Sequence, residues 1–348
     1  MKILHIIPSY VPAYRYGGPI ESVHNLNVGL VKNGAKVTVY TTNIDGLNDL
    51  NVPTDAPVIK DGVKIFYFKN SFPRVWFYSR DLRKALAQNG QQFDIFHITS
   101  TFLAASTMGA YYAKKFKKPY IISPRGNLME SPLKKNKKKW LKKWLYLAFI
   151  EKRNLRDAGA IHFTAPAEKD DYIKEGFPLK KAVVLPNIFD ISKIKNADYK
   201  QGYLRDKFKL SADRKIILYL GRLSWIKGFD TLIPAFKKVI EREPKAVLVL
   251  VGGNDKGYKN SIEDLVKKNN LTKQVIFVGM LVGIEKNSAL RDTDVFVLPS
   301  YSESFGMSAI EAMSLGIPTI ITKGVGIAPI IKKAKAGLVV KKDESELS

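Results

Sequence analysis

Short apolar runs alternate along the chain with longer stretches in which apolar residues recur every three or four positions. Runs rich in β-branched and aromatic residues predict strands, and the 3.6-residue period predicts helices. The strands predicted in the first half are residues 2–7, 36–42, 63–68, 93–99, 119–123, 160–164 and 182–185. The helices predicted between them are residues 19–32, 80–88, 102–115, 137–156 and 167–175. This alternation predicts a parallel sheet with helices on both faces.

The same rhythm restarts after a polar, irregular segment at residues 187–213. The strands predicted in the second half are residues 215–220, 246–251, 274–278, 294–298, 318–321 and 337–340. With 348 residues, the chain has the length of two domains. We therefore predict two Rossmann-like, doubly wound α/β domains, 1–190 and 191–348, with the boundary near Asp190. Ligands of such sheets bind beyond the carboxyl ends of the strands, so we expect a binding cleft between two facing domains.

The loop after the first strand of the second half carries two cations. Arg222 and Lys227 lie five residues apart, between Gly221 and Gly228, and a predicted helix follows. A guanidinium fork and an ammonium point charge on one loop can converge on a single diphosphate. The alternative is a loop whose cations are merely solvated.

A second segment of interest follows the apolar strand that ends at residue 298. Ser304 is the predicted N-cap of the next helix. The amides of Phe305, Gly306 and Met307 would then form an anion site at the helix start. Glu303 and Glu311 flank this start, and at ~1.5 Å rise per residue their separation is ~12 Å. That is too far for a paired acid and base, but it suits the two ends of an extended ligand, a hexose and a ribose.

Together these two segments resemble glycosyltransferase family 4, whose members have the GT-B fold and use nucleotide-sugar donors. The match consists of Gly221-Arg222 with Lys227-Gly228, and of Glu303 and Glu311 with seven residues between them. By this resemblance, Arg222 and Lys227 would bind the donor phosphates and stabilise the leaving diphosphate. Glu303 would bind hydroxyls of the donor hexose, the amides of Phe305, Gly306 and Met307 would assist, and Glu311 would hold the ribose.

Weaker matches extend the resemblance over nearly the whole chain. Gly17-Gly18 resembles the glycine-rich loop after the first strand, and Met280-Leu281 resembles the segment that meets the nucleobase. Asn254, after Gly252-Gly253, matches a loop near the donor. The resemblance implies a hexosyltransferase in which residues 191–348 form the nucleotide-sugar donor side and residues 1–190 form the acceptor side. It also implies retention of the anomeric configuration.

The chain departs from the family pattern in two places. Many members carry a histidine after the fifth strand of the first domain, where this chain reads Ser123-Pro124-Arg125-Gly126. This form resembles a bacterial subgroup, and Arg125 is the candidate catalytic residue there; the alternative is a turn residue bonded to backbone. Members also end on a helix that crosses back to the first domain, and we expect that helix to be missing here.

Composition adds a hypothesis about membranes. The formal net charge is +25, and there is no cysteine, so disulfides and thiolate metal sites are excluded. Residues 133–146 form a basic amphipathic stretch of a kind that lies at membrane interfaces. Its candidate membrane-contact residues are Lys134, Lys138, Trp140, Lys142 and Trp144. We expect a cytoplasmic enzyme of polysaccharide or glycolipid synthesis, peripheral at the inner face of the cell membrane; the alternative is a helix whose Trp face packs on the core.

Several other features of the sequence have simpler explanations. Asp292-Thr293-Asp294 matches a metal-binding Asp-x-Asp pattern, but Asp294 opens an apolar strand, so we predict no metal and no cofactor. The strand histidines are expected to be core residues, whereas His24 could reach the cleft. The rival functions are a nucleotide-sugar epimerase, an inactive donor-binding module and, on charge alone, a nucleic-acid-binding protein. The sequence favours a UDP-sugar over a GDP-sugar but fixes neither sugar, acceptor nor linkage.

Overall fold

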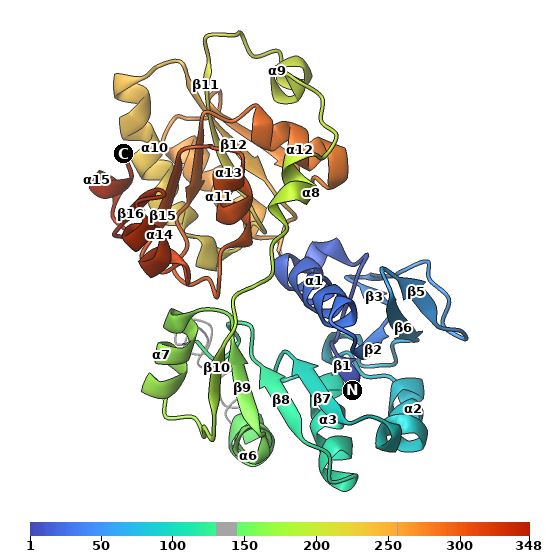
Figure 1. Ribbon diagram of the computed structural model, residues 1–348. Helices are drawn as coiled ribbons and strands as arrows, with labels where there is room; N and C mark the ends of the chain where they lie inside the picture. Colours follow the sequence, from blue (N-terminus) through green and yellow to red (C-terminus); the bar gives the residue numbers. More distant parts are fainter. Residues whose placement is uncertain (130–144, 256) are drawn as a thin grey trace. The chain divides into compact units, whose positions relative to one another are not determined.

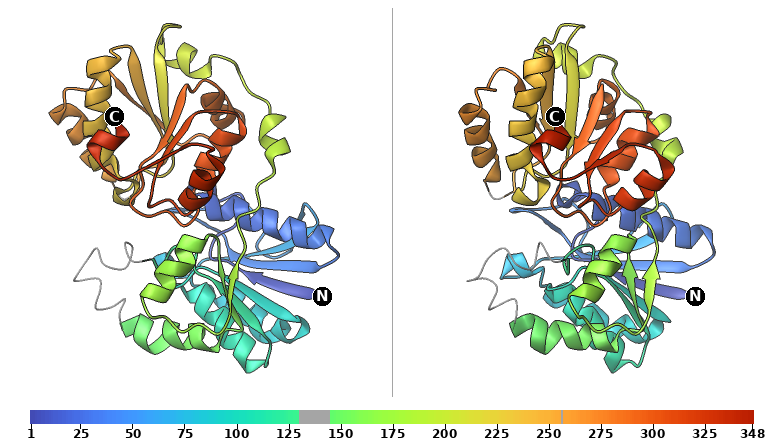
Figure 2. Two further views of the ribbon diagram at one scale, coloured as in Figure 1. Left: turned by 60° about the vertical axis from the view of Figure 1, so that its left-hand side comes forward. Right: turned by 90° about the vertical axis from the view of Figure 1, so that its left-hand side faces the viewer.

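A computed structural model describes residues 1–129, 145–255 and 257–348. The chain forms two compact units, Met1–Ile188 and Phe189–Ser348, and each has its own sheet. The predicted boundary fell two residues after this division. The Rossmann-like α/β class predicted for both halves is confirmed. Figure 2 shows helices flanking the sheet of each unit.

Unit 1 contains an eight-stranded sheet in the order β10-β9-β8-β7-β1-β2-β6-β5. Its strands are β1 Lys2–Ile6, β2 Lys36–Thr42, β5 Val58–Lys60, β6 Val63–Phe68, β7 Ile95–Thr99, β8 Tyr120–Ser123, β9 Ala160–Phe163 and β10 Ala182–Val184. All neighbours run parallel except β5, which pairs antiparallel with β6. A small hairpin, β3 Ile44–Asp45 and β4 Asn48–Asp49, stands apart from the sheet. The parallel strands agree with the prediction, whereas β3, β4 and β5 were not expected.

Helices cover both faces of this sheet. They are α1 Gly18–Lys32, α2 Arg80–Asn89, α3 Ala104–Lys115, α6 Lys152–Asp157 and α7 Pro166–Lys174, with one π-helical turn at Leu147–Glu151 and short 3-10 turns at Tyr14–Tyr16, Arg74–Trp76 and Gly90–Gln92. Successive side chains of β1 point to opposite faces. Ile3 packs with Ile20 and Val23 of α1, whereas Leu4 packs with Leu82 of α2. The sheet therefore separates two apolar cores.

Unit 2 has a six-stranded parallel sheet in the order β13-β12-β11-β14-β15-β16. Its strands are β11 Lys215–Leu220, β12 Ala246–Val251, β13 Val275–Gly279, β14 Val295–Leu298, β15 Thr319–Thr322 and β16 Leu338–Val340. Its helices are α8 Ile191–Lys195, α9 Tyr203–Phe208, α10 Phe229–Arg242, α11 Tyr258–Lys268, α12 Gly283–Arg291, α13 Met307–Ser314, α14 Ala328–Ala334 and α15 Glu344–Leu347, with a 3-10 turn at Trp225–Lys227.

The strand order of unit 2 reverses between β11 and β14, which are hydrogen-bonded neighbours at the centre of the sheet. Strands β15 and β16 lie side by side at one edge (Figure 1). In doubly wound sheets the connections on either side of such a switch point leave in opposite directions. The loops that follow the two central strands then diverge and leave room for a ligand. A ligand bound at the switch point of unit 2 would therefore contact the loops after β11 and β14.

Candidate functional site

The loop after β11 is fixed by close backbone contacts with its neighbours. Leu223 forms a bridge with Asn254, and its N–H donates to the carbonyl of Gly253 at 2.9 Å. The carbonyl of Ile226 accepts from the N–H of Tyr301, in the loop after β14, at 2.8 Å. The loop that carries Arg222 and Lys227 is thus bonded on one side to the loop after β12 and on the other to the loop after β14.

Glycines permit this packing because they have no Cβ. A Cβ on Gly228, which has φ 74°, would lie 2.0 Å from the carbonyl oxygen of Pro299. A Cβ on Gly252 would lie 1.8 Å from the carbonyl oxygen of Gly221. Both glycines are therefore required by close backbone approach around the switch point.

The structure brings two predicted site residues into direct contact. The Nζ atom of Lys227 is hydrogen-bonded and ion-paired to Oε2 of Glu303. The two side chains are 11% and 24% exposed, so the pair is largely shielded from water. Backbone bonds hold Glu303 as well: its N–H donates to Gly324 at 2.9 Å, and its carbonyl accepts from Gly326 at 2.8 Å. An ammonium and a carboxylate from loops that follow neighbouring strands thus meet at the switch point.

Arg222 lies on the same loop but is more exposed. Its side chain is 49% exposed and lies 3.8 Å from Asp255, which follows β12. Its carbonyl accepts a 2.9 Å hydrogen bond from the hydroxyl of the buried Tyr219. Asn254, the other candidate in this region, accepts from the N–H of Lys259 through its side-chain oxygen at 3.0 Å. The guanidinium keeps a loose ion pair and can therefore turn toward an anion.

Helix α13 begins two residues later than predicted. Its N-cap is Gly306, with φ 106°, and not Ser304. A Cβ on Gly306 would lie 2.6 Å from Val325, and this close packing explains why a glycine occupies the cap. Phe305 is buried, and its carbonyl accepts from the N–H of Ile327 at 3.2 Å. The amides at the start of the helix, including that of Met307, lie outside its own i to i−4 hydrogen bonds, as at any helix start.

Glu311 is a buried residue on α13. Its side chain is 8% exposed, and Oε1 lies 3.1 Å from Nζ of Lys286 on α12. Helix α12 follows the segment that contains Met280, which is 49% exposed, and Leu281, which is buried. The carboxylate is therefore positioned by a cation on the helix that follows the segment predicted to meet the nucleobase. Sequence reasoning missed Lys286, and the only available signal was its place four residues into the helix that follows Leu281.

Unit 1 holds Arg125 in a turn at the carboxyl end of β8. Arg125 and Gly126 both have positive φ, 55° and 81°. A guanidinium nitrogen of Arg125 donates to the side chain of Asn187 and lies 3.5 Å from the hydroxyl of Ser22, while its buried Nε has no hydrogen-bond partner within the described residues. Burial lowers the pKa of the guanidinium to about 10. The side chain thus bonds to side chains, and the alternative of a turn residue bonded to backbone does not describe it.

The glycine pair after β1 forms the start of α1. Gly17, with φ 82°, is the N-cap of the helix, and Gly18 is its first residue. A Cβ on Gly17 would meet nothing within 4 Å, so packing alone does not require this glycine. The conformation with positive φ does favour it. The predicted glycine-rich loop therefore lies at the switch point of unit 1, between β1 and β7.

Three histidines form a buried row beneath Arg125. The rings of His5 and His97 are 4.3 Å apart, and those of His97 and His162 are 5.3 Å apart. Burial, together with the nearby charge of Arg125, lowers the pKa of His5 to about 3 and that of His162 to about 4; burial also holds the pKa of His97 well below its ordinary value. His24 is buried as well, bonded to Tyr10 at 2.9 Å and to Asp61 at 2.8 Å, both within unit 1.

The lowered pKa values of His5, His97 and His162 predict that unit 1 loses stability in mild acid. Above pH 6.5 each ring is neutral in both states; as the pH falls from 6.5 toward 4 only the unfolded chain gains protons. The cost is up to about 1.4 kcal/mol per pH unit per ring. Two carboxyls act in the opposite direction, because burial raises the pKa of Glu151 to about 7 and also raises that of Glu168. These raised pKa values add stability that is present at low pH and lost as the pH rises.

Because three imidazoles oppose two carboxyls, unit 1 has a net loss of stability as the pH falls. We expect the free energy of unfolding of unit 1 to fall by roughly 1–3 kcal/mol between pH 6.5 and pH 5, as measured by urea denaturation. Glu151→Gln removes one opposing group, so its stability should fall more steeply over the same range. A slope equal to that of the unchanged chain would contradict the role assigned to Glu151.

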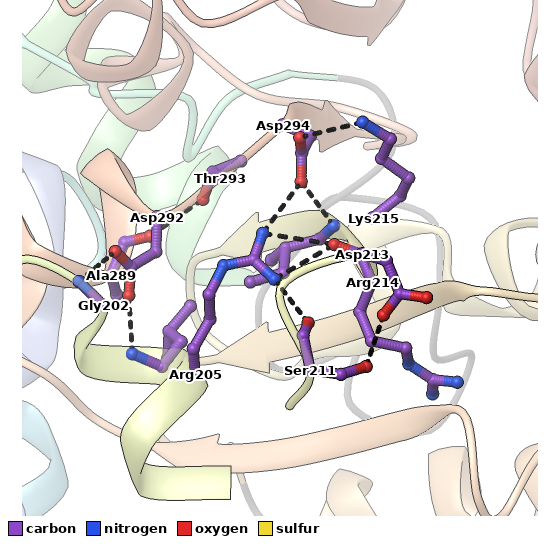
Figure 3. Close-up of polar contacts among 12 residues, drawn as sticks. Gly202, Arg205, Ser211, Asp213, Arg214, Lys215, Ala289, Asp292, Thr293 and Asp294 are labelled. Atoms are coloured by element: carbon purple, nitrogen blue, oxygen red, sulfur yellow. Dashed lines mark hydrogen bonds and ion pairs between the residues drawn. The ribbon is translucent and has the colours of Figure 1, made fainter. Parts of the chain in front are cut away.

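The Asp-x-Asp pair is used by the fold of unit 2. Asp292 accepts from the N–H groups of Gly202 at 2.9 Å and Leu204 at 2.6 Å, at the start of α9. Asp294 accepts from the N–H of Ile216 at 2.8 Å and lies within 4 Å of Arg205 and Lys215 (Figure 3). Asp294 precedes β14, so it lies at the amino edge of the sheet, opposite the loops that carry Lys227 and Glu303. Within residues 1–129, 145–255 and 257–348, no cluster of three acidic or histidine side chains is arranged to hold a metal ion.

The predicted membrane-contact residues Lys134, Lys138, Trp140, Lys142 and Trp144 lie outside the described residues. None of the helices in the described part of the chain has both the length and the apolar character that crossing a bilayer requires. The membrane hypothesis from that segment stays a prediction.

Comparison with known proteins decides the family. A family model described as Glycosyltransferase Family 4 matches residues 16–193, and one described as Glycosyl transferases group 1 matches residues 201–347. The chain belongs to glycosyltransferase family 4. The family 4 protein is a sugar-transferring enzyme of the GT-B type, as the sequence predicted.

Relatives of this family 4 glycosyltransferase span nearly its whole length. An uncharacterized glycosyltransferase of Methanocaldococcus jannaschii is 28% identical over 98% of this chain and 85% of its own length. Alpha-monoglucosyldiacylglycerol synthase of Streptococcus pneumoniae is 26% identical over 92% of this chain and 70% of its own. The crystal structure of Anabaena HepE in complex with UDP-glucose matches with a TM-score of 0.74 and 19% identity, over 100% of this chain and 87% of that one. This structural likeness supports the fold.

Proposed function

We propose that the enzyme transfers a hexose from a nucleoside diphosphate sugar to a glycan or lipid-linked acceptor, with retention of configuration and without a metal ion. A uridine nucleotide is favoured over a guanosine nucleotide. The observation that carries the proposal is the contact between Lys227 and Glu303 at the switch point, beside the start of α13. Doubly wound sheets bind their ligands at such points.

The chemistry of the donor explains why these groups would be needed. Lys227 and Arg222 supply positive charge, and the α13 amides supply N–H donors, where a diphosphate would lie. When the bond between the anomeric carbon and the phosphate oxygen breaks, negative charge grows on the diphosphate, and these groups stabilise it. The acceptor oxygen bonds to the anomeric carbon on the same face, and its proton passes to the leaving phosphate. No metal is needed if the cations neutralise the diphosphate.

The carboxylates would hold the two sugars. Glu303 has hydroxyl-accepting oxygens that the hexose could share with Lys227. Glu311, fixed by Lys286, would accept from the ribose hydroxyls. The structural neighbour HepE binds UDP-glucose by its description, and the S. pneumoniae relative is named for a glucolipid product. Both names support a UDP-sugar donor and a lipid-linked acceptor as the first compounds to test.

Glu311→Ala tests the donor site. Because a hydrogen bond to a charged group contributes about 1.5–3 kcal/mol, we expect the Kd for a UDP-sugar to rise about 10- to 100-fold. The measurement is a thermal-shift titration against UDP-, GDP- and dTDP-sugars, repeated with a chelator. Glu263→Ala, which removes an exposed carboxylate paired with Lys259 on α11, is the matched control. Equal affinity of the Glu311→Ala variant and the control would remove Glu311 from the site, and loss of binding with the chelator would contradict metal independence.

A further inference from the structure

Two neighbouring loops of unit 1 hold large apolar side chains in solvent. Leu47, in the turn between β3 and β4, is 91% exposed. Phe72, Val75 and Trp76, in the segment after β6, are 92%, 73% and 61% exposed. We call these four residues the apolar loop pair. Several large apolar side chains exposed on neighbouring loops of a folded protein are typical of a site of interaction.

Arg74 fixes the two loops to each other. Its Nε donates to the carbonyl of Gly46 at 3.2 Å, and its terminal nitrogen donates to the carbonyl of Asn48 and lies 2.6 Å from a carboxylate oxygen of Asp49. The three acceptors surround Leu47, and Arg74 itself lies between Phe72 and Val75 in the chain. The side chain of Arg74 therefore links the backbone of the loop that carries Leu47 to the loop that carries Phe72, Val75 and Trp76.

Further bonds hold the loops onto the body of unit 1. The N–H of Gly46 donates to the hydroxyl of Tyr16 at 2.8 Å, and the ring of Tyr16 packs edge-on against Phe77 at 5.7 Å. The N–H of Asn70 donates to the side chain of Asn43 at 2.9 Å. These bonds anchor the backbone of both loops to unit 1, while the four apolar side chains stay exposed.

The charged residues around the apolar loop pair indicate an anionic partner. Residues 44–49 and 69–84, which contain the two loops, hold five cations, Lys69, Arg74, Arg80, Arg83 and Lys84, against three carboxylates, Asp45, Asp49 and Asp81, and Arg74 is paired with Asp49. Lys69 and Arg80, at the two ends of the loop, are exposed. Cations that flank protruding Trp, Phe and Leu side chains match an anionic bilayer, where the phosphates lie above the acyl boundary. The chain as a whole, at +25, is attracted to the same surface.

We propose that the apolar loop pair docks unit 1 on an anionic lipid bilayer, with the four side chains in the acyl boundary and the flanking cations at the phosphates. The loops follow β2 and β6, so they lie at the carboxyl edge of the sheet, the edge that also carries Gly17, Gly18 and Arg125. An acceptor that stays in the bilayer would thus present its hydroxyl to that edge. This inference rests on the lipid-linked acceptor of the proposed function, but its test measures binding alone.

Sedimentation with vesicles tests the surface without any sugar. We expect Phe72→Asp together with Trp76→Asp to lower partitioning onto phosphatidylglycerol vesicles about tenfold or more, because each apolar side chain that enters the bilayer contributes to binding. Ile59→Asp, at a 64% exposed apolar position on β5, is the matched control and should bind as the unchanged chain does. Equal partitioning of all three proteins would overturn the proposal. Retained UDP-sugar binding in lipid-free buffer would show that the donor site of unit 2 is intact, and an unchanged urea unfolding curve would show the same for the fold of unit 1.

A single labelled cysteine then reports depth. The chain has no cysteine, so Leu47→Cys can carry the only environment-sensitive fluorophore, with Ile59→Cys as control. We expect vesicles to blue-shift the label at 47 and brominated lipid to quench it, with neither effect at 59. A label at 47 that stays in water while the protein is vesicle-bound would overturn the proposal. So would a lipid-free dimer, or a protein complex formed without lipid, that the Phe72→Asp and Trp76→Asp changes abolish.

Discussion

Lys227→Ala should lower kcat/KM for sugar transfer about 100- to 1,000-fold, the usual cost of removing one preorganised donor to a charge that develops in the transition state. Lys227 is 11% exposed and contacts Glu303, so its ammonium acts in a partly dehydrated place where a charge is worth more than in water. Release of UDP from a UDP-sugar, with a lipid or glycan acceptor present, measures the effect.

The control for this variant removes a cation of the same unit away from the switch point. Lys238→Ala, on α10, deletes an exposed ion pair with Glu344 and should keep full activity. Lys227→Ala combined with Glu303→Gln tests for an unpaired carboxylate, because the amide keeps an oxygen that accepts from hydroxyls but carries no charge. If repulsion from an unpaired Glu303 caused the loss, the double variant would be more active than Lys227→Ala alone. Full activity of Lys227→Ala, with binding unchanged, would refute the assignment of the site.

Gly252→Ala should destabilise unit 2 by at least about 3 kcal/mol, in the range that only a backbone collision or an equivalent defect produces. The added Cβ would lie 1.8 Å from the oxygen and 2.6 Å from the carbon of the Gly221 carbonyl, and neither atom can rotate away. The loops after β11 and β12 would have to separate, and Arg222 would move with them. Urea unfolding of unit 2 and the Kd for a UDP-sugar should change together.

The neighbouring residue supplies the control. A Cβ on Gly253 would meet nothing within 4 Å, so Gly253→Ala should change stability by no more than about 0.5 kcal/mol. The pair differs by one position in the same loop and by the same added methyl group. Similar stabilities for the two variants would contradict the close approach of Gly252 to Gly221.

The sequence predicted the parallel strands of both units within two residues, because buried strands of α/β proteins are continuous apolar runs such as Ala246–Val251. It missed β5, whose three residues carry little pattern of their own. The available signal was Asp61-Gly62 between Ile59-Lys60 and Val63-Lys64: both turn residues have positive φ, 51° and 79°, as a two-residue hairpin requires.

The candidate site was predictable as a set of residues but not as an arrangement. Loop position and charge singled out Lys227 and Glu303, yet their contact depends on the order of strands in the sheet, which no local pattern specifies. Ser304 was wrong as the N-cap, because packing against Val325 decides the start of α13 in favour of Gly306. The role of Lys286 could not be predicted from the sequence because it depends on contact with Glu311, which lies on the next helix of the chain.

The pairing of β11 with β14 also has a consequence for folding. Ile217 and Leu218 lie opposite Val295 and Phe296, so the two halves of the Lys227–Glu303 contact come from segments that are 76 residues apart in the chain. A nascent chain that ends after β13 already contains the loop with Lys227, but it lacks β14 and the loop with Glu303. Substrate can therefore stabilise only the finished unit, and by mass action it protects all of that unit at once.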